Sequence, residues 1–214
     1  MHSEQLFRAI FFVLITLMLA IRAYFGWQAR RTGQSSWAVE SKAVDREGRW
    51  SVLTRGFLFF YMVVTIALYA AAPFWLDSFA VSLPAWSRWA GAALGAASLP
   101  FLVWVHYILG QHWSTNLRLR EEHRLVTIGP YRWVRHPMYT VLFSFFIGLT
   151  LVSASWLVVV LTVASISVLC RRIGIEEQMM LEQFGEEYRE YLARTGRLLP
   201  RMRRQPMDDS RGGG

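Results

Sequence analysis

Residues 138–170 read MYTVLFSFFIGLTLVSASWLVVVLTVASISVLC, a stretch of about 33 residues without a charged side chain. About 20 consecutive apolar residues are enough for a helix to span a bilayer. One helix over the whole stretch would be about 50 Å long, which is too long for a single crossing. The polar sequence SASW at 153–156 offers a break near the middle. We therefore expect two shorter helices, 138–152 and 155–172, folded as a tight hairpin.

Three further apolar runs precede this hairpin, at 6–27, 53–76 and 89–109. The first run is too long for the apolar part of a typical signal peptide, and no clear cleavage site follows it. The third run contains Pro100, which is expected to kink a helix. That run also carries small residues that would let another helix approach closely: Gly91, Ala92, Gly95 and Ala96. The sequence thus predicts an all-α integral membrane protein with about five transmembrane helices and a C-terminal helical hairpin.

Positive charge is distributed unevenly along the chain, whose formal net charge is +8. All but three of the 23 Lys and Arg residues lie in segments 26–56, 110–137 and 171–214. Cytoplasmic loops of membrane proteins carry such an excess, and five crossings would place all three segments on one side. This pattern indicates membrane topology rather than a nucleic-acid-binding face. We expect the C-terminus in the cytoplasm, and the Arg-rich, compact chain suggests a prokaryotic inner membrane.

The chain changes character after Arg172. Apolar residues recur at spacings of three and four between 173 and 192, which predicts an amphipathic cytoplasmic helix that continues from the last membrane helix. Gly185 is a candidate interruption. The small polar residues 205–214 are expected to be disordered, which leaves 1–204 as a single membrane-embedded domain.

The densest group of rigid and polar residues is GPYRWVRHPMY at 129–139, immediately before the hairpin. Gly129 and Pro130 predict a turn, and Pro137 suits the first position of a helix. His136 precedes a proline and is expected to be extended, so His136 and Tyr139 would lie at a helix N-terminus suited to an anionic or carbonyl group. The alternative is an interfacial loop whose aromatic rings form a membrane belt.

A second polar group follows the hairpin, where Arg172 and Glu176 are four positions apart and therefore share a helix face. Glu177 lies next to them. A simple surface ion pair is the alternative, but ionisable groups at the end of a membrane helix usually serve a function.

The spacing of His, Cys and carboxylate residues predicts no zinc or iron centre. The single cysteine, Cys170, is interpreted as a packing residue. Glycine-rich nucleotide motifs and a Gly-x-Ser-x-Gly elbow do not occur in the sequence.

Two segments together resemble a known family: HRLVTIGPYRWVRHPMY at 123–139 and RRIGIEEQMMLEQFGEEYREY at 171–191. They are similar to the isoprenylcysteine carboxyl methyltransferases and the related phospholipid methyltransferases, over roughly 105–200. The resemblance implies a membrane enzyme that uses S-adenosylmethionine without a Rossmann domain and releases S-adenosylhomocysteine. This implication agrees with the missing glycine-rich motif.

The resemblance also implies roles for individual residues. Arg172 corresponds to an arginine that holds the substrate carboxylate, and Arg172 and Glu176 are the candidate catalytic pair. Asn116 stands where relatives that methylate prenylated cysteine have a glutamine one methylene longer. The implied cofactor-binding residues are Asn116, His123, Arg124, Leu125, Val126, Tyr131, His136, Pro137, Met138, Tyr139 and Glu176.

The function implied is methyl transfer to a lipid-like acceptor that reaches the site from the bilayer. The arginine at 172 favours a carboxylate acceptor of the isoprenylcysteine type. A phospholipid amine remains an alternative, as do an NADPH-dependent membrane reductase of sterols or enones and a helical scaffold without enzymatic activity. Membrane lipids are the other expected partners, and no nucleic acid or obligate protein partner is inferred.

Overall fold

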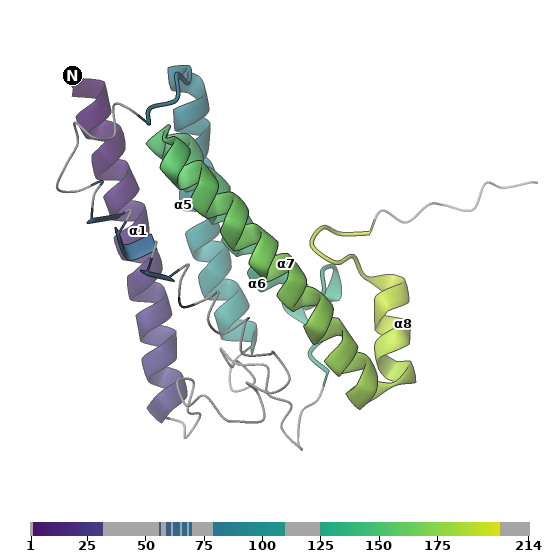
Figure 1. The fold of residues 1–214 in the computed structure, drawn as a ribbon. Coiled ribbons are helices and arrows are strands. Elements are labelled where there is room, and N and C mark those ends of the chain that lie inside the picture. The colour runs from purple at the N-terminus through teal and green to yellow at the C-terminus, as the bar shows by residue number, and fades with distance from the viewer. Residues whose placement is uncertain are drawn as a thin grey trace, which may run out of the picture.

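The computed structural model describes residues 2–31, 79–109 and 125–201, together with scattered positions from 56 to 69. These residues form a helical protein without strands, in which the only β-type pairings are two isolated bridges. The prediction of an all-α fold is confirmed (Figure 1). The elements are α1 (His2–Arg31), α5 (Ala85–Leu109), the 3-10 helix η2 (Gly129–Arg132), α6 (Pro137–Ser153), α7 (Trp156–Phe184) and α8 (Glu186–Arg194).

Among the residues that the structure describes, three helices are long and apolar enough to cross a membrane, namely residues 3–28 of α1, 85–108 of α5 and α7. Helix α6 is equally apolar in character but shorter. The helix expected over 53–76 is described only at scattered helical positions, so the predicted number of crossings is not tested. The tail predicted to be disordered, 205–214, lies outside the described residues.

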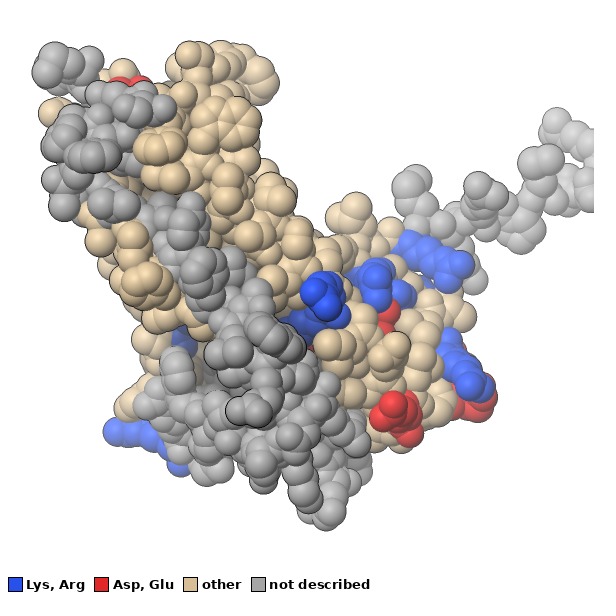
Figure 2. Space-filling model, in the orientation of Figure 1, with Lys and Arg blue, Asp and Glu red and all other residues tan. Residues whose placement is uncertain are grey.

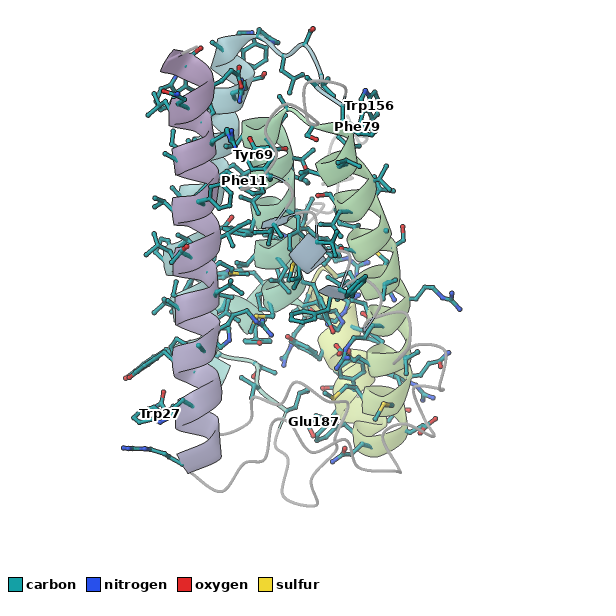
Figure 3. The ribbon with its side chains drawn as sticks, turned by 60° about the vertical axis from the view of Figure 1, so that its left-hand side comes forward. Phe11, Trp27, Tyr69, Phe79, Trp156 and Glu187 are labelled. Atoms are coloured by element: carbon teal, nitrogen blue, oxygen red, sulfur yellow. The ribbon has the colours of Figure 1, made fainter. Side chains whose placement is uncertain are left out.

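The predicted hairpin is present, and its turn falls within the SASW sequence. Helix α6 ends at Ser153, Ala154 takes a left-handed conformation with φ 47°, and α7 begins at Trp156. Backbone bonds from residues 79–81 hold the turn: the Val81 N–H donates to the Ala154 carbonyl at 2.7 Å, and the Trp156 N–H donates to the Phe79 carbonyl at 2.9 Å. Figure 3 shows the side chains of Phe79 and Trp156 together at this end of the molecule.

Helix α7 does not stop at 172 but continues unbroken to Phe184, as the amphipathic pattern after Arg172 predicted. Gly185, with φ 51°, separates α7 from α8, which confirms the interruption predicted there. Helix α8 lies beside the end of α7 in Figure 1. The charged part of α7 is therefore a rigid extension of a membrane helix, and α8 turns back along it.

Helices α5 and α6 approach each other closely through glycine. A Cβ atom added to Gly148 of α6 would lie 2.7 Å from the Gly95 backbone nitrogen of α5. One added to Gly91 would lie 2.8 Å from the Gly148 carbonyl oxygen. Real Cβ atoms do not approach backbone atoms so closely, so this contact requires residues without a side chain. Gly91 and Gly95 thus have the packing role predicted for them, whereas Ala96, predicted with them, is exposed.

The core of the bundle lies between α1, α5 and α6. Helix α1 contributes one apolar stripe with spacings of four and three, which packs on buried residues of the other two helices. The stripe consists of Phe7, Phe11, Leu14 and Met18. Figure 3 shows Phe11 beside Tyr69, whose rings have centroids 4.7 Å apart.

Arg88 is a buried cation at the end of the bundle where α6 stops. Its Nε and one terminal nitrogen donate to the Val152 carbonyl at 3.1 and 3.0 Å. Its other terminal nitrogen contacts Glu4 at 2.5 Å, and the guanidinium lies 4.0 Å from the centroid of the Phe7 ring. The Arg88 side chain therefore satisfies a backbone carbonyl at the end of α6 and links the beginning of α1 to α5.

Candidate functional site

The segment from η2 to the start of α6 forms a stiff corner. Gly129 has φ 59°, and a Cβ atom there would lie 2.9 Å from Cγ1 of Ile108, so both the turn and the space favour glycine. Pro130 is buried, and its carbonyl accepts the Val134 N–H at 3.1 Å. Pro137 begins α6, as predicted. The corner therefore presents residues 135–139 at the N-terminus of α6.

His136 differs from the expectation of a fully extended residue. Its φ is −123° but its ψ is 59°. Two backbone bonds account for this conformation: its N–H donates to the Arg197 carbonyl at 3.1 Å, and its carbonyl accepts the Thr140 N–H at 3.1 Å. The side chain is buried. Pairing with Arg197 therefore accompanies a conformation that differs from the extended one expected for a residue before proline.

Residues 195–198, here called the C-terminal strap, lie along the corner. The Gly196 N–H donates to the Trp133 carbonyl at 3.1 Å, and the Arg135 N–H donates to the Gly196 carbonyl at 2.8 Å. The Thr140 hydroxyl donates to the Leu198 carbonyl at 2.7 Å. The strap therefore covers the backbone that carries His136, a relationship that sequence analysis did not predict.

Tyr139, Arg172 and Glu176 form a hydrogen-bonded cluster between α6 and α7. The Tyr139 hydroxyl donates to Oε1 of Glu176 at 2.6 Å. Nε of Arg172 donates to that carboxylate oxygen and to the Tyr139 hydroxyl, each at 3.0 Å. The structure brings the two predicted polar groups together, and the pair at 172 and 176 is more than a surface ion pair because it includes a tyrosine from another helix.

His136 lies between two carboxylates of α7. Its Nδ1 is 3.7 Å from Oε2 of Glu176, and its Nε2 is 3.3 Å from Oε1 of Glu177. Glu177 also binds Nε of Arg135 at 3.0 Å and a terminal nitrogen of Arg197 at 2.7 Å. Adjacent residues of one helix therefore reach both nitrogens of the imidazole, and the site combines two carboxylates with three guanidinium groups.

Three tyrosines close the site on the side of α8. The Tyr191 hydroxyl donates to the Tyr131 carbonyl at 2.6 Å, and the Tyr188 and Tyr191 rings have centroids 5.9 Å apart. Burial raises the pKa of Tyr131 and of Tyr188, and it raises the pKa of Tyr191 to about 12. All three hydroxyls therefore remain protonated at neutral pH and act as neutral polar groups.

The remaining predicted residues fall into two sets. Pro137 is buried, Met138 packs against the bundle core, and Leu125 and Val126 are half-buried just before the corner. Asn116, His123 and Arg124 lie outside the described residues.

Cys170, interpreted as a packing residue, is exposed on α7. In the described ranges, no three His, Cys, Asp or Glu side chains are grouped to hold a metal ion.

Sequence reasoning missed Arg135 and Arg197 as parts of the site, and it noted Glu177 without a role. A sequence signal existed only for Arg135, which precedes His136 in the corner. Arg197 is held through pairing of distant segments, for which local sequence gives no signal. In Figure 2 the visible part of the bundle is almost uncharged, whereas charged side chains gather over the end of α7, α8 and the segment that follows.

Comparison with known sequences locates the similarity in the part of the chain that carries this cluster. Residues 93–182 match the isoprenylcysteine carboxyl methyltransferase (ICMT) family. The resemblance to this family is confirmed. The match includes the corner, Tyr139, Arg172, Glu176 and Glu177, and it ends before α8 and the strap.

Two curated proteins are similar to this chain over about 80 residues each. A protein-S-isoprenylcysteine O-methyltransferase from Tribolium castaneum is 39% identical over 80 residues, which are 37% of this chain and 28% of that protein. One from Xenopus laevis is 38% identical over 81 residues, again 37% of this chain and 28% of that protein. The matched region thus spans little more than a quarter of either relative.

A solved structure shows that the helical fold is shared. It is the structure of the eukaryotic intramembrane Ras methyltransferase ICMT without a monobody, with a TM-score of 0.57 and 22% sequence identity. The alignment covers 89% of this chain and 66% of that chain. Together with the family match and the apolar helices, this likeness identifies an integral membrane protein of the ICMT fold.

Proposed function

We propose that this protein transfers a methyl group from S-adenosylmethionine to the carboxylate of an isoprenylcysteine-type lipid. The observation that carries the proposal is the cluster of Tyr139, Arg172 and Glu176, which joins the two family motifs at the end of a membrane helix. The names of the matched relatives support the same chemistry. Because the match spans only part of those relatives, the activity is inferred for this chain rather than taken from them.

The residues of the site fit a sulfonium donor. Glu176 supplies a carboxylate that would balance the positive sulfonium and bind the donor's amino or hydroxyl groups. Tyr131, His136 and Tyr139 provide aromatic surfaces around it, and aromatic faces attract cations. The stiff corner with Pro137 would hold the other end of the donor. No glycine-rich loop is needed for such a set of contacts.

The cofactor supplies an electrophilic methyl group on a sulfonium. When bound, it would supply this methyl group to an oxygen of the acceptor carboxylate, and the residues of the chain would hold donor and acceptor in line. No proton is transferred, so orientation is the main task of the protein. Opposite charges disappear in this step, and a site with little water therefore favours it.

Arg172 is assigned to orient the acceptor. Nε of Arg172 is hydrogen-bonded to Tyr139 and to Glu176. These two bonds orient the planar guanidinium group, whose geometry suits a carboxylate. A phospholipid amine would instead need a base to take its proton and would be repelled by this cation when protonated. The charge of Arg172 therefore favours the carboxylate acceptor.

Cofactor and acceptor preference can be tested on the purified protein in detergent. S-Adenosylmethionine and NADPH are titrated in parallel, and we expect binding of the methyl donor only. With S-adenosylmethionine labelled in its methyl group, an S-farnesylcysteine whose amino group is blocked should give a base-labile methyl ester. The carboxamide of the same compound should give no product, and neither should phosphatidylethanolamine. Binding of NADPH alone would overturn the methyltransferase proposal, and methylation of the amine lipid alone would overturn the carboxylate assignment.

We further propose that the site faces the cytoplasm, which the charge distribution supports. The test uses a Cys170→Ser background with a cysteine introduced at Arg201, next to the strap. A membrane-impermeant maleimide should label this cysteine in inside-out vesicles and leave it unlabelled in sealed right-side-out vesicles. The reverse labelling would contradict the orientation.

A further inference from the structure

We propose that Glu177 is a positioning residue that ties the C-terminal strap to His136 and thereby holds the cofactor side of the site in shape. The inference rests on the proposed function. It assigns a role to a carboxylate that does not belong to the Tyr139–Arg172–Glu176 cluster. It also assigns a role to a segment, 195–198, that lies beyond the part of the chain matched by the family.

Both oxygens of the Glu177 carboxylate are occupied by the protein itself. Oε1 accepts a hydrogen bond from Nε of Arg135 at 3.0 Å and lies 3.3 Å from Nε2 of His136. Oε2 accepts a hydrogen bond from Arg197 at 2.7 Å. A cofactor would have to displace one of these charge-assisted contacts, which are the strong ones. Glu177 is therefore placed to organise the site rather than to bind the donor.

Glu176 has a different set of contacts, although it is the adjacent residue. Consecutive residues of a helix point about 100° apart, and Glu176 reaches Tyr139 and Arg172 through Oε1. Its Oε2 is 3.7 Å from Nδ1 of His136, the longest of these contacts. Glu176, the proposed donor ligand, and Glu177, the proposed positioning residue, therefore differ in the groups that their carboxylate oxygens contact.

Arg197 connects Glu177 to the backbone of His136. Its guanidinium binds Glu177, and its carbonyl accepts the His136 N–H at 3.1 Å. Arg135 makes a parallel link, because it binds Glu177 and also donates to the Thr195 carbonyl at 2.5 Å and the Leu192 carbonyl at 3.4 Å. Glu177 therefore fastens the strap to the corner through two arginines: Arg135, which precedes His136, and Arg197, whose carbonyl accepts the His136 N–H.

The test compares Glu177→Gln and Arg197→Ala with the double variant. Arg197→Lys is the conservative variant, and Arg189→Ala is the matched control because Arg189 is an exposed arginine of α8 that pairs with Glu186 within the same helix. S-Adenosylhomocysteine binding is measured by calorimetry, and Arg197→Ala should bind about tenfold more weakly, the loss of one charge-assisted hydrogen bond. Glu177→Gln should bind at least as weakly, because it weakens the contact with Arg135 as well. The double variant should bind no more weakly than the weaker single variant, since both changes break the same link.

A merely structural role would not produce the same pattern. We expect KM for the methyl donor to rise in both single variants with little change in kcat, Arg197→Lys to recover much of the loss, and Arg189→Ala to behave as the parent protein. Hydrogen exchange should be faster at the amides of Arg135, His136 and Gly196 in Arg197→Ala, because their bonds to the corner and strap open more often.

Three outcomes would overturn the inference. If Glu177→Gln loses binding while Arg197→Ala keeps it, Glu177 is a direct ligand of the donor. If Arg197→Ala lowers the melting temperature but leaves affinity and KM unchanged, the strap is structural only. If amide exchange at His136 in Arg197→Ala equals that of Arg189→Ala, the strap does not hold the corner. Failure of the parent protein to bind S-adenosylhomocysteine would instead refute the proposed function, and the exchange measurement would still decide whether the strap holds His136.

Discussion

The hydroxyl of Tyr139 donates a 2.6 Å hydrogen bond to the carboxylate of Glu176, a residue 37 positions later in the chain. This bond joins the N-terminus of α6 to the charged extension of α7, and Arg172 contacts both partners. A phenol, a carboxylate and a guanidinium are thereby concentrated at the end of an apolar helix pair.

Replacement of Tyr139 by Phe should weaken binding of the methyl donor without unfolding the protein. The change leaves the Glu176 carboxylate without its hydroxyl donor, and a hydrogen bond to a charged group contributes about 1.5–3 kcal/mol, or roughly a tenfold to hundredfold change in Kd. Calorimetry with S-adenosylmethionine measures the effect. The control is Tyr107→Phe, because Tyr107 is 78% exposed on α5. Unchanged affinity in Tyr139→Phe would show that Glu176 does not hold the donor.

Replacement of Arg172 by Ala should separate donor binding from acceptor turnover. Tyr139 still positions Glu176 in this variant, so donor affinity should change by no more than about threefold. Removal of a guanidinium bound to a carboxylate should reduce turnover by about a hundredfold, which corresponds to about 2.7 kcal/mol. Steady-state assays with blocked S-farnesylcysteine measure the loss, and Arg171→Ala, an exposed neighbour, is the control. Loss of donor binding in a folded Arg172→Ala protein would refute this division of roles.

Replacement of Gly148 by Ala should destabilise the bundle. The new Cβ would lie 2.7 Å from the Gly95 nitrogen, so α5 and α6 must separate, and overpacking of this kind costs about 1–3 kcal/mol. Thermal unfolding in detergent, followed by helical circular dichroism, measures the change. Gly174→Ala is the matched control because a Cβ atom there meets nothing within 4 Å. It should be neutral or slightly stabilising, since alanine favours a helix.

Replacement of Arg88 by Met should destabilise the protein while sparing the site. The change removes both hydrogen bonds to the Val152 carbonyl and leaves that buried acceptor unsatisfied, which costs about 1–3 kcal/mol. Val152 is about 22 Å along α6 from Pro137, so donor affinity should be retained. Thermal unfolding measures the loss of stability, and calorimetry on the same preparation measures the affinity for the donor. Glu4→Gln, whose side chain is 63% exposed, should cost less than about 1 kcal/mol.

Local sequence predicted much of the helical framework. The SASW break gave the position of the α6–α7 turn, because polar residues interrupt an apolar run that is too long for one crossing. The small residues at 91 and 95 indicated a close helix contact, and Pro137 indicated the start of α6. Each of these features depends on neighbours within a few residues, and such features can be read without a structure.

The site could be predicted only as two separate polar groups. The four-residue spacing of Arg172 and Glu176 placed them on one helix face, but it did not show that Tyr139 binds both. The strap was not predicted at all, since its bonds join residues about 60 positions apart. The ψ angle of His136 also followed from that pairing and not from its own sequence.

The sequence by itself determined which segments are apolar helices and where they break, because hydrophobic run length and local backbone preference act within a few residues. Only the tertiary structure decided that the proline corner, the charged end of α7 and residues 195–198 meet. The physical reason is that their contacts depend on how α6, α7 and α8 pack. The orientation of His136 between two carboxylates is a consequence of that packing, and no pattern along the chain encodes it.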